Sequence, residues 1–255
     1  MRTVLSVCAV VALLCLVMAS PAPAMDGNEI LKKVDEVQSA SKDSVGNVTM
    51  TLVDKGGQTK ERTMKVWRRH YKDRDDWSVL KFTAPADIRN LGFLSLADDK
   101  MYLYLPAFDR VRRIASHARK ESFAGSDLSN DDLSTGKYSS HYDARISKEE
   151  GGVYVLDLKR KPSSERIYPR VIAWVNKKDF TVSRMELYDD GNKLWKSSEI
   201  KNEQVQGYWT PMEIRMTDVT KSHTTIMKIT KIEYDKNLED SIFTERYLKR
   251  SVKGD

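Results

Sequence analysis

The chain contains very little cysteine. Its 255 residues include two, Cys8 and Cys15, and both lie within the first 24 residues. If that segment is removed, neither a disulfide bond nor thiol chemistry remains, so one sizeable core must stabilise the fold. Cys15 follows Leu13 and Leu14 inside an apolar run, whereas a lipid-modified cysteine needs small residues before it. We therefore reject a lipoprotein signal.

Long hydrophobic runs are also scarce. The run over residues 4–18 is apolar apart from Ser6, which is short for a membrane span. Arg2 precedes it and an Ala-x-Ala pattern ending at Ala24 follows it, which is the layout of a secretory signal. We predict that residues 1–24 are a cleaved signal peptide, with an uncleaved anchor as the alternative. Residues 25–255 contain no comparable run and would form one soluble domain.

Motifs for catalysis are missing as well. The sequence has no Gly-x-Ser-x-Gly, no His-Glu-x-x-His and no phosphate-binding glycine loop. The four histidines, at positions 70, 117, 141 and 223, lack metal-ligand spacing. We therefore expect no enzyme activity, no cofactor and no metal. His117 and His141 flank one long loop, which leaves a shared role open.

One acidic run has the beginning of a calcium-binding loop. It starts at Asp127, but its sixth position is Asp132 where such a loop needs glycine, and its twelfth is Tyr138 where it needs glutamate. We interpret the run as an Asp- and Ser-rich turn with helix caps.

Neither sign of charge is in large excess. The formal net charge is +6, and losing Arg2 with the signal peptide leaves +5. A basic secreted protein meets membrane surfaces and acidic proteins, so we expect no nucleic-acid partner. The main basic stretch is either a strand edge protected by charge or a docking patch for lipid headgroups or an acidic partner. It contains Arg110, Arg112, Arg113, Arg119 and Lys120.

Helical spacing occurs mainly at the two ends of the mature chain. Asp26 is a candidate N-cap, and the apolar residues Ile30, Leu31 and Val34 share one face of a helix that should end near residues 41–43. Residues 238–248 predict a closing helix. Residues 115–144 are rich in Ser, Asp, Gly and Asn, and a connection of this length is usually functional, such as a lid, or contains short helices of its own.

The rest of the chain alternates with a period of two between Gly- and Asp-rich turns. Sequential hairpins predict an antiparallel meander, and so many strands are expected to curl. We predict a mainly β (α+β) fold, an incomplete antiparallel β-barrel of about eleven strands with the terminal helices and the lid.

Several predicted strands are apolar on both faces. Leu103 and Leu105 alternate with Tyr102 and Tyr104, whereas a sheet with one wet face would be polar on one side. Either helices cover the second face, or a curved sheet encloses an apolar hollow. Flexible methionines such as Met227 suit such a hollow, although Met also fills ordinary cores.

An ordered series of segments resembles the bacterial outer-membrane lipoprotein-sorting proteins, relatives of the periplasmic carrier LolA. The resemblance spans nearly all of the mature chain. Its segments are 82–94, 104–106, 110–114, 122–133, 188–193, 207–211 and 243–248.

This resemblance implies a LolA/LolB-like incomplete barrel whose lid covers a hollow for acyl chains. The protein would be a periplasmic carrier that shields a lipoprotein or another acylated lipid on its way toward the outer membrane. An inner-membrane transporter or an outer-membrane acceptor would be its partner. We predict that the hollow and its lid, residues 116–140, involve Phe93, Leu94, Leu103, Leu105 and Phe123, with Gly92 and Gly125 at tight turns or hinges.

Two other functions remain open at this point. A sensor or regulatory module could use the same fold to read a mislocalised lipid and dock on a membrane protein. A hydrolase is disfavoured, because no nucleophile, base and orienting group can be named together.

Overall fold

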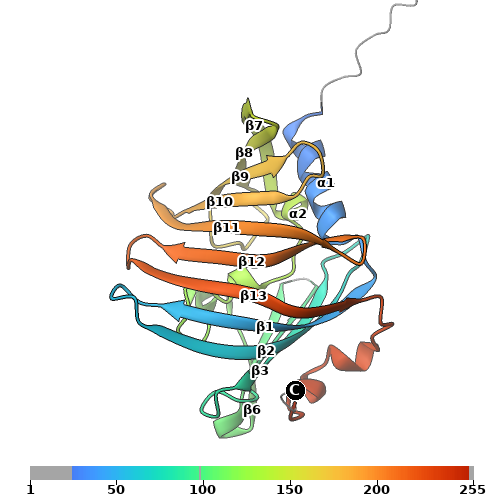
Figure 1. Cartoon of the computed structure of the whole chain (residues 1–255), viewed down its shortest axis with the longest axis vertical. Helices are drawn as coiled ribbons and strands as arrows, with labels where there is room; N and C mark the ends of the chain where they lie inside the picture. Colours follow the sequence, from blue (N-terminus) through green and yellow to red (C-terminus); the bar gives the residue numbers. More distant parts are fainter. Residues whose placement is uncertain (1–24, 98, 253–255) are drawn as a thin grey trace, which may run out of the picture.

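The computed structural model describes residues 25–97 and 99–252, so the predicted signal peptide lies outside the described residues. Thirteen strands form one antiparallel sheet, and a helix, α1, precedes them (Figure 1). In chain order the elements are α1 (Gly27–Gln38), β1 (Asp43–Val53), β2 (Thr59–Arg69), β3 (Trp77–Ala84), β4 (Gly92–Leu96), β5 (Lys100–Leu105), η1 (Pro106–Phe108), β6 (Arg110–Arg113), η2 (Ser116–Lys120), η3 (Asp131–Leu133), α2 (Tyr138–His141), β7 (Tyr142–Glu150), β8 (Val153–Arg160), β9 (Arg170–Asn176), β10 (Val182–Tyr188), β11 (Leu194–Val205), β12 (Tyr208–Asp218), β13 (His223–Tyr234), η4 (Asp240–Ile242) and α3 (Glu245–Leu248).

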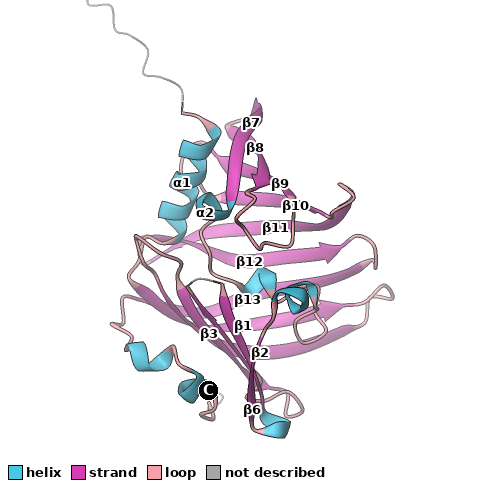
Figure 2. Ribbon diagram, turned by 180° about the vertical axis from the view of Figure 1, so that it is seen from behind, coloured by secondary structure: helices cyan, strands magenta, loops and turns pink. Residues whose placement is uncertain are grey.

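The strand order explains the path of the middle segment. The sheet runs β6-β5-β4-β3-β2-β1-β13-β12-β11-β10-β9-β8-β7, so β6 and β7 follow each other in the chain but lie at opposite edges. Residues 114–141 must therefore cross from one edge to the other, and they do so over the concave face (Figure 2). The first and last strands, β1 and β13, pair in the middle of the sheet.

The predicted antiparallel meander is confirmed, but the count of about eleven strands is wrong. Each alternating run between two turn signals forms a strand of its own, including the four-residue edge strand β6. The sheet is curved and open, because β6 and β7 do not pair with each other within the described residues. The result is a deep trough.

Helix α1 begins as predicted and ends early. Asp26 Oδ1 accepts the Glu29 N–H and Glu29 Oε2 accepts the Asp26 N–H, both at 2.8 Å, which is a reciprocal capping box. The last helical residue is Gln38, three residues before the predicted end. At Gly27 a side chain would meet the Ala144 carbonyl oxygen at 2.5 Å, so glycine lets α1 lie directly on β7.

The predicted helix over residues 238–248 is wrong. The segment forms two short helical turns, η4 and α3, on either side of Phe243 and Thr244. Thr244 caps α3 by accepting the Tyr247 N–H at 3.2 Å. The break lets the Phe243 ring, which is 3% exposed, pack against the sheet.

Two apolar clusters lie on the two faces of the sheet. Leu80 and Phe82 of β3 belong to the concave cluster with the middle segment and α1, whereas Val79 belongs to the convex cluster. The C-terminal residues Phe243 and Leu248 cover the convex face of β2–β5. The strands that are apolar on both faces therefore have a cover on each side.

Candidate functional site

Buried charges attach the middle segment to the trough. The Arg119 guanidinium is 2% exposed and donates to Asp131 at 2.6 Å and to Asp99 at 2.9 Å. These carboxylates raise the pKa of Arg119 against the opposing effect of its burial. The predicted docking role of Arg119 is thus wrong, since its charge is already paired inside the protein.

The acidic run continues this attachment at Asp132. Its carboxylate accepts hydrogen bonds from the Ser129 N–H at 2.7 Å, from Lys196 Nζ at 3.0 Å and from the Tyr168 hydroxyl at 2.9 Å. Burial, together with this carboxylate, raises the pKa of Tyr168 well above its usual value. The run is therefore a buried polar anchor, and its side chains bond to the protein itself.

Part of the middle segment fills one half of the trough. Phe123 is 1% exposed, stacks on Phe82 with ring centroids 5.6 Å apart and meets Phe93 edge-on at 5.6 Å. It leads into a tight turn at Ala124 and Gly125, whose φ angles are +51° and +71°. This half of the concave face is packed core.

The other half of the trough contains a cavity of about 240 Å³. It is bounded by β1–β4 on one side, β12 and β13 on the other, and the end of α1 above. Many of its apolar side chains are only half-buried, in contrast to the core residues around Phe123. Among them are Val66, Ile214, Met227, Ile229 and Ile232.

A second cavity of about 270 Å³ adjoins the first along β9–β12. Its apolar lining includes Val171, Val182 and Met185. The two cavities share six lining residues, so they meet. The shared residues are Gln38, Arg68, Leu128, Asp132, Pro211 and Ile214. Ligand pockets in proteins commonly enclose about 300–1,000 Å³, a size that the two reach together.

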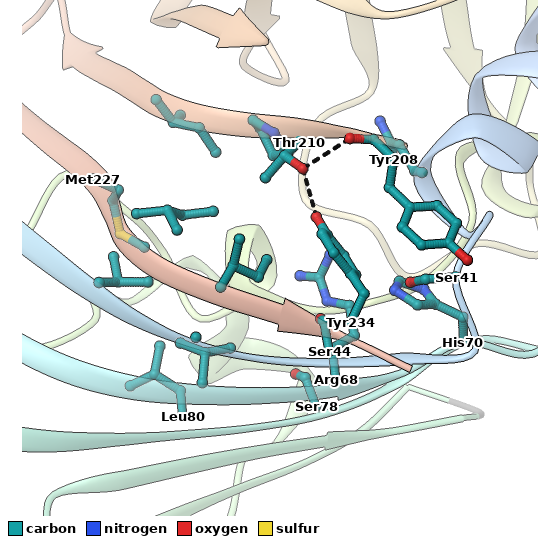
Figure 3. A pocket seen from close by; sticks show the side chains of 18 of the residues that line it. Ser41, Ser44, Arg68, His70, Ser78, Leu80, Tyr208, Thr210, Met227 and Tyr234 are labelled. Carbon is teal, nitrogen blue, oxygen red and sulfur yellow. Dashed lines mark hydrogen bonds between the residues drawn. The ribbon is translucent and has the colours of Figure 1, made fainter. Parts of the chain in front are cut away.

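Polar groups gather at one end of the first cavity (Figure 3). Arg68 points into the pocket beside Tyr234, whose hydroxyl lies 2.6 Å from the Thr210 hydroxyl. Burial raises the pKa of Tyr234, so its hydroxyl stays protonated at neutral pH. His70 borders the same end, and its Nδ1 lies 2.6 Å from the Asp76 carboxylate. An apolar hollow with a polar end matches the shape of an amphiphile.

Known proteins place the chain in a family. A family model described as "Uncharacterized protein" matches residues 74–250. The chain belongs to the family that this model describes. No curated protein matches the chain.

Solved structures share its fold. A DUF1329 family protein from Desulfovibrio piger is 29% identical with a TM-score of 0.81, over 87% of this chain and 97% of that one. An outer membrane lipoprotein-sorting protein domain from Vibrio parahaemolyticus is 24% identical with a TM-score of 0.81, over 88% and 98%. A LolA superfamily protein from Nitrosomonas europaea is 20% identical with a TM-score of 0.73, over 88% and 100%.

The structure separates the residues predicted at the hollow. Phe93 borders the first cavity. Leu94, its neighbour in β4, lies in the convex cluster against Leu248, because successive strand residues point to opposite faces. The prediction that Leu94 lies near the hollow is therefore wrong.

The other predicted positions lie outside both cavity linings. Leu103 and Phe123 pack in or against the concave core, and Leu105 is half-buried near the β5 end. Gly92 has no positive φ angle; an added side chain would meet Leu248 at 2.8 Å, so this glycine accommodates the C-terminal segment. Gly125 occupies a tight turn, as expected for a glycine with positive φ.

The remaining arginines lie at the sheet edge. Arg110, Arg112 and Arg113 are exposed on β6, and none makes an ion pair within the described residues. The preceding turn, η1, presents Phe108, whose side chain is 76% exposed. We predicted no role for Phe108 from the sequence, although it lies two residues before Arg110.

Three of the four histidines, at positions 70, 141 and 223, have structural partners. His223 Nδ1 lies 2.6 Å from the Asp127 carboxylate, and His141 Nδ1 lies 3.1 Å from the Ser164 hydroxyl. Within residues 25–97 and 99–252, no group of three or more His, Cys, Asp or Glu side chains could hold a metal ion. In the same part of the chain, no helix has both the length and the apolar character to cross a membrane.

Proposed function

We propose that the protein is a periplasmic carrier that shields acyl chains in the two adjoining cavities and moves an acylated lipid or lipoprotein toward the outer membrane. The observation that carries this proposal is the row of half-buried apolar side chains facing unfilled space, including Met227, Ile229 and Ile214. In an ordinary core such side chains would be covered on all sides by other protein atoms. The predicted signal peptide supports the periplasmic location.

The energetics favour retention over spontaneous release. Each methylene group moved from water into the cavities contributes about 0.8 kcal/mol, so one long acyl chain binds strongly. Water competes poorly for such a site. Release therefore needs a second apolar acceptor, either a membrane or another protein with a hollow.

The arginine edge would bring the carrier to a membrane surface. Arg110, Arg112 and Arg113 can bind headgroup phosphates, and Phe108 can enter the interfacial layer beside them. The two features belong to consecutive elements, η1 and β6, so one surface presents both. We propose that this edge docks on lipid headgroups during loading or delivery.

Native mass spectrometry of the protein purified from a bacterial periplasm, followed by lipid extraction, tests the carrier function. We expect a co-purifying acylated species. A ligand-free mass, together with no uptake of added phospholipid or lipopeptide, would contradict the proposal.

A pair of neighbouring substitutions locates the ligand. Met227→Trp should fill part of the first cavity, whereas Ile226→Trp changes the adjacent residue on the opposite face of β13. Displacing about two methylene groups of ligand costs about 1.6 kcal/mol, so Met227→Trp should lower affinity about tenfold. Equal affinities for the two variants would place the ligand elsewhere.

A further inference from the structure

The strand register places a polar row at one end of the first cavity. Ser44 of β1 is opposite Tyr234 of β13 on one side and Arg68 of β2 on the other, and Arg68 is in turn opposite Ser78 of β3. All four residues line the cavity (Figure 3). One arginine thus lies between two serines on a single line across four strands.

The next row toward the cavity interior is apolar. Ile232, Gly46, Val66, Leu80 and Phe93 are successive cross-strand partners from β13 to β4, and all of them line the same cavity. A side chain at Gly46 would meet the Lys231 carbonyl oxygen at 2.8 Å, so glycine lets β13 lie close to β1 in this row. A step of two residues along the strands therefore changes the lining from polar to apolar.

The polar row has unused hydrogen-bonding capacity. Ser44 and Ser78 are 9% and 5% exposed, and their hydroxyl groups make no hydrogen bond within the described residues. The Arg68 side chain is exposed, and its guanidinium likewise has neither a hydrogen bond nor an ion pair in that part of the chain. Neither serine hydroxyl is among the fully buried atoms that lack a partner, so both reach the open space of the cavity, where a group from outside can bind them.

The carboxylates that border the cavities already have partners. Asp132 binds Lys196, Asp131 binds Arg119, and Asp76 binds His70. Asp35 accepts the Tyr138 and Ser139 N–H groups at 2.9 Å. Of the two charged residues that border both cavities, Arg68 and Asp132, only Arg68 lacks a partner among the described residues, so the bound group should be an anion.

We propose that the ligand is an anionic lipid with two acyl chains, whose headgroup phosphate binds Arg68 and the hydroxyls of Ser44 and Ser78. This inference rests on the proposed carrier function. Arg68 and five other residues border both cavities, so two chains that diverge from one headgroup can enter one cavity each. The planar guanidinium suits a phosphate because it donates two parallel hydrogen bonds.

The test compares four probes on the full mature protein: dioleoyl phosphatidylglycerol, uncharged dioleoylglycerol, single-chain lysophosphatidylglycerol and inorganic phosphate. We expect phosphatidylglycerol to bind best, with one molecule per protein. Arg68→Gln should weaken its binding about tenfold to a hundredfold, the usual worth of a hydrogen bond to a charged group, and leave dioleoylglycerol unchanged.

Matched variants control for the charge change and for folding. Lys65→Gln removes the same charge from the opposite face of β2, where Lys65 lies over the Trp67 ring, and should keep the preference for phosphatidylglycerol. Ser44→Ala combined with Ser78→Ala should reduce that preference in part. Thermal unfolding checks that each variant is folded.

These measurements distinguish a failure of the carrier function from a failure of the proposed headgroup site. If neither dioleoyl lipid binds, the carrier function itself fails. If both bind equally well to the wild-type protein, or if Arg68→Gln changes nothing, only the headgroup site is overturned. Binding of the single-chain lipid as tight as that of phosphatidylglycerol, or binding of inorganic phosphate alone, would overturn the two-chain assignment.

Discussion

Residues 115–141 cover the concave face of the sheet, and residues 238–252 cover the convex face of β2–β5, yet the two covers are attached differently. The concave cover is held by buried ion pairs, Arg119 with Asp131 and Asp132 with Lys196, in addition to the packing of Phe123. The convex cover is held mainly by apolar contacts of Phe243 and Leu248. Both covers are mostly irregular in structure.

The difference has a consequence for ligand binding. Ion pairs fix a segment through a few directed contacts and leave neighbouring apolar surface unfilled, as at Met227 and Ile229. Apolar packing consumes that surface, because close contact is itself the source of stability. The concave face thus keeps room for a ligand beneath a firmly attached cover.

The largest expected effect breaks the concave attachment. Arg119→Leu leaves Asp131 and Asp99 without their buried partner, and removing one member of a buried ion pair costs about 3–5 kcal/mol of unfolding free energy. Chemical denaturation measures the loss. The adjacent substitution Lys120→Leu removes an exposed pair with Asp190 and should cost less than about 1 kcal/mol. Similar losses for the two variants would contradict an attachment by buried charge.

The next effect concerns the convex cover. Leu248→Ala removes a side chain that is 0% exposed and should lower the unfolding free energy by about 2–5 kcal/mol. Lipid affinity should be unchanged when measured at a temperature where the variant is folded. A loss of affinity would show that the convex cover also shapes the hollow, and the two faces would then be coupled.

The pH dependence of stability tests how Lys81 attaches the convex cover. Its ammonium is 0% exposed and donates to the carbonyls of Leu248, at 2.7 Å, and Arg250, while burial lowers its pKa to about 8. Between about pH 8 and the ordinary lysine value of 10.5, the unfolded chain binds more protons than the folded one, so stability contributed by this group rises with pH. Subtracting the pH profile of Lys81→Met isolates this rise. A flat difference would contradict it.

The smallest effect on stability is expected at the arginine edge. Phe108→Ser changes an exposed side chain and should alter the unfolding free energy by no more than about 0.5 kcal/mol. Binding to vesicles that contain phosphatidylglycerol should nevertheless weaken, as should binding after Arg112→Gln. Co-sedimentation measures both. If both variants bind the vesicles as well as the wild-type protein does, the arginine edge is only a solvated strand edge.

Local patterns were sufficient for several elements. The capping box of Asp26 and Glu29 and the alternating runs depend on neighbours within a few residues, so helix α1 and the meander could be predicted. The prediction of a closing helix was wrong because the tertiary packing of Phe243 outweighed a weak helical pattern. The prediction that Leu94 lies near the hollow was wrong because alternation separates the two faces of a strand without showing which face borders the hollow.

By itself, the sequence determined the antiparallel meander, the irregular middle segment and the resemblance to LolA-like proteins, since these depend on local patterns and their order. The tertiary structure alone decided that Arg119 is buried while Arg112 is exposed, because the partners Asp99 and Asp131 lie 20 and 12 residues away. It also decided that Ser44, Arg68, Ser78 and Tyr234 form one row. Strand register joins positions that are far apart in the chain, and no local spacing encodes that register.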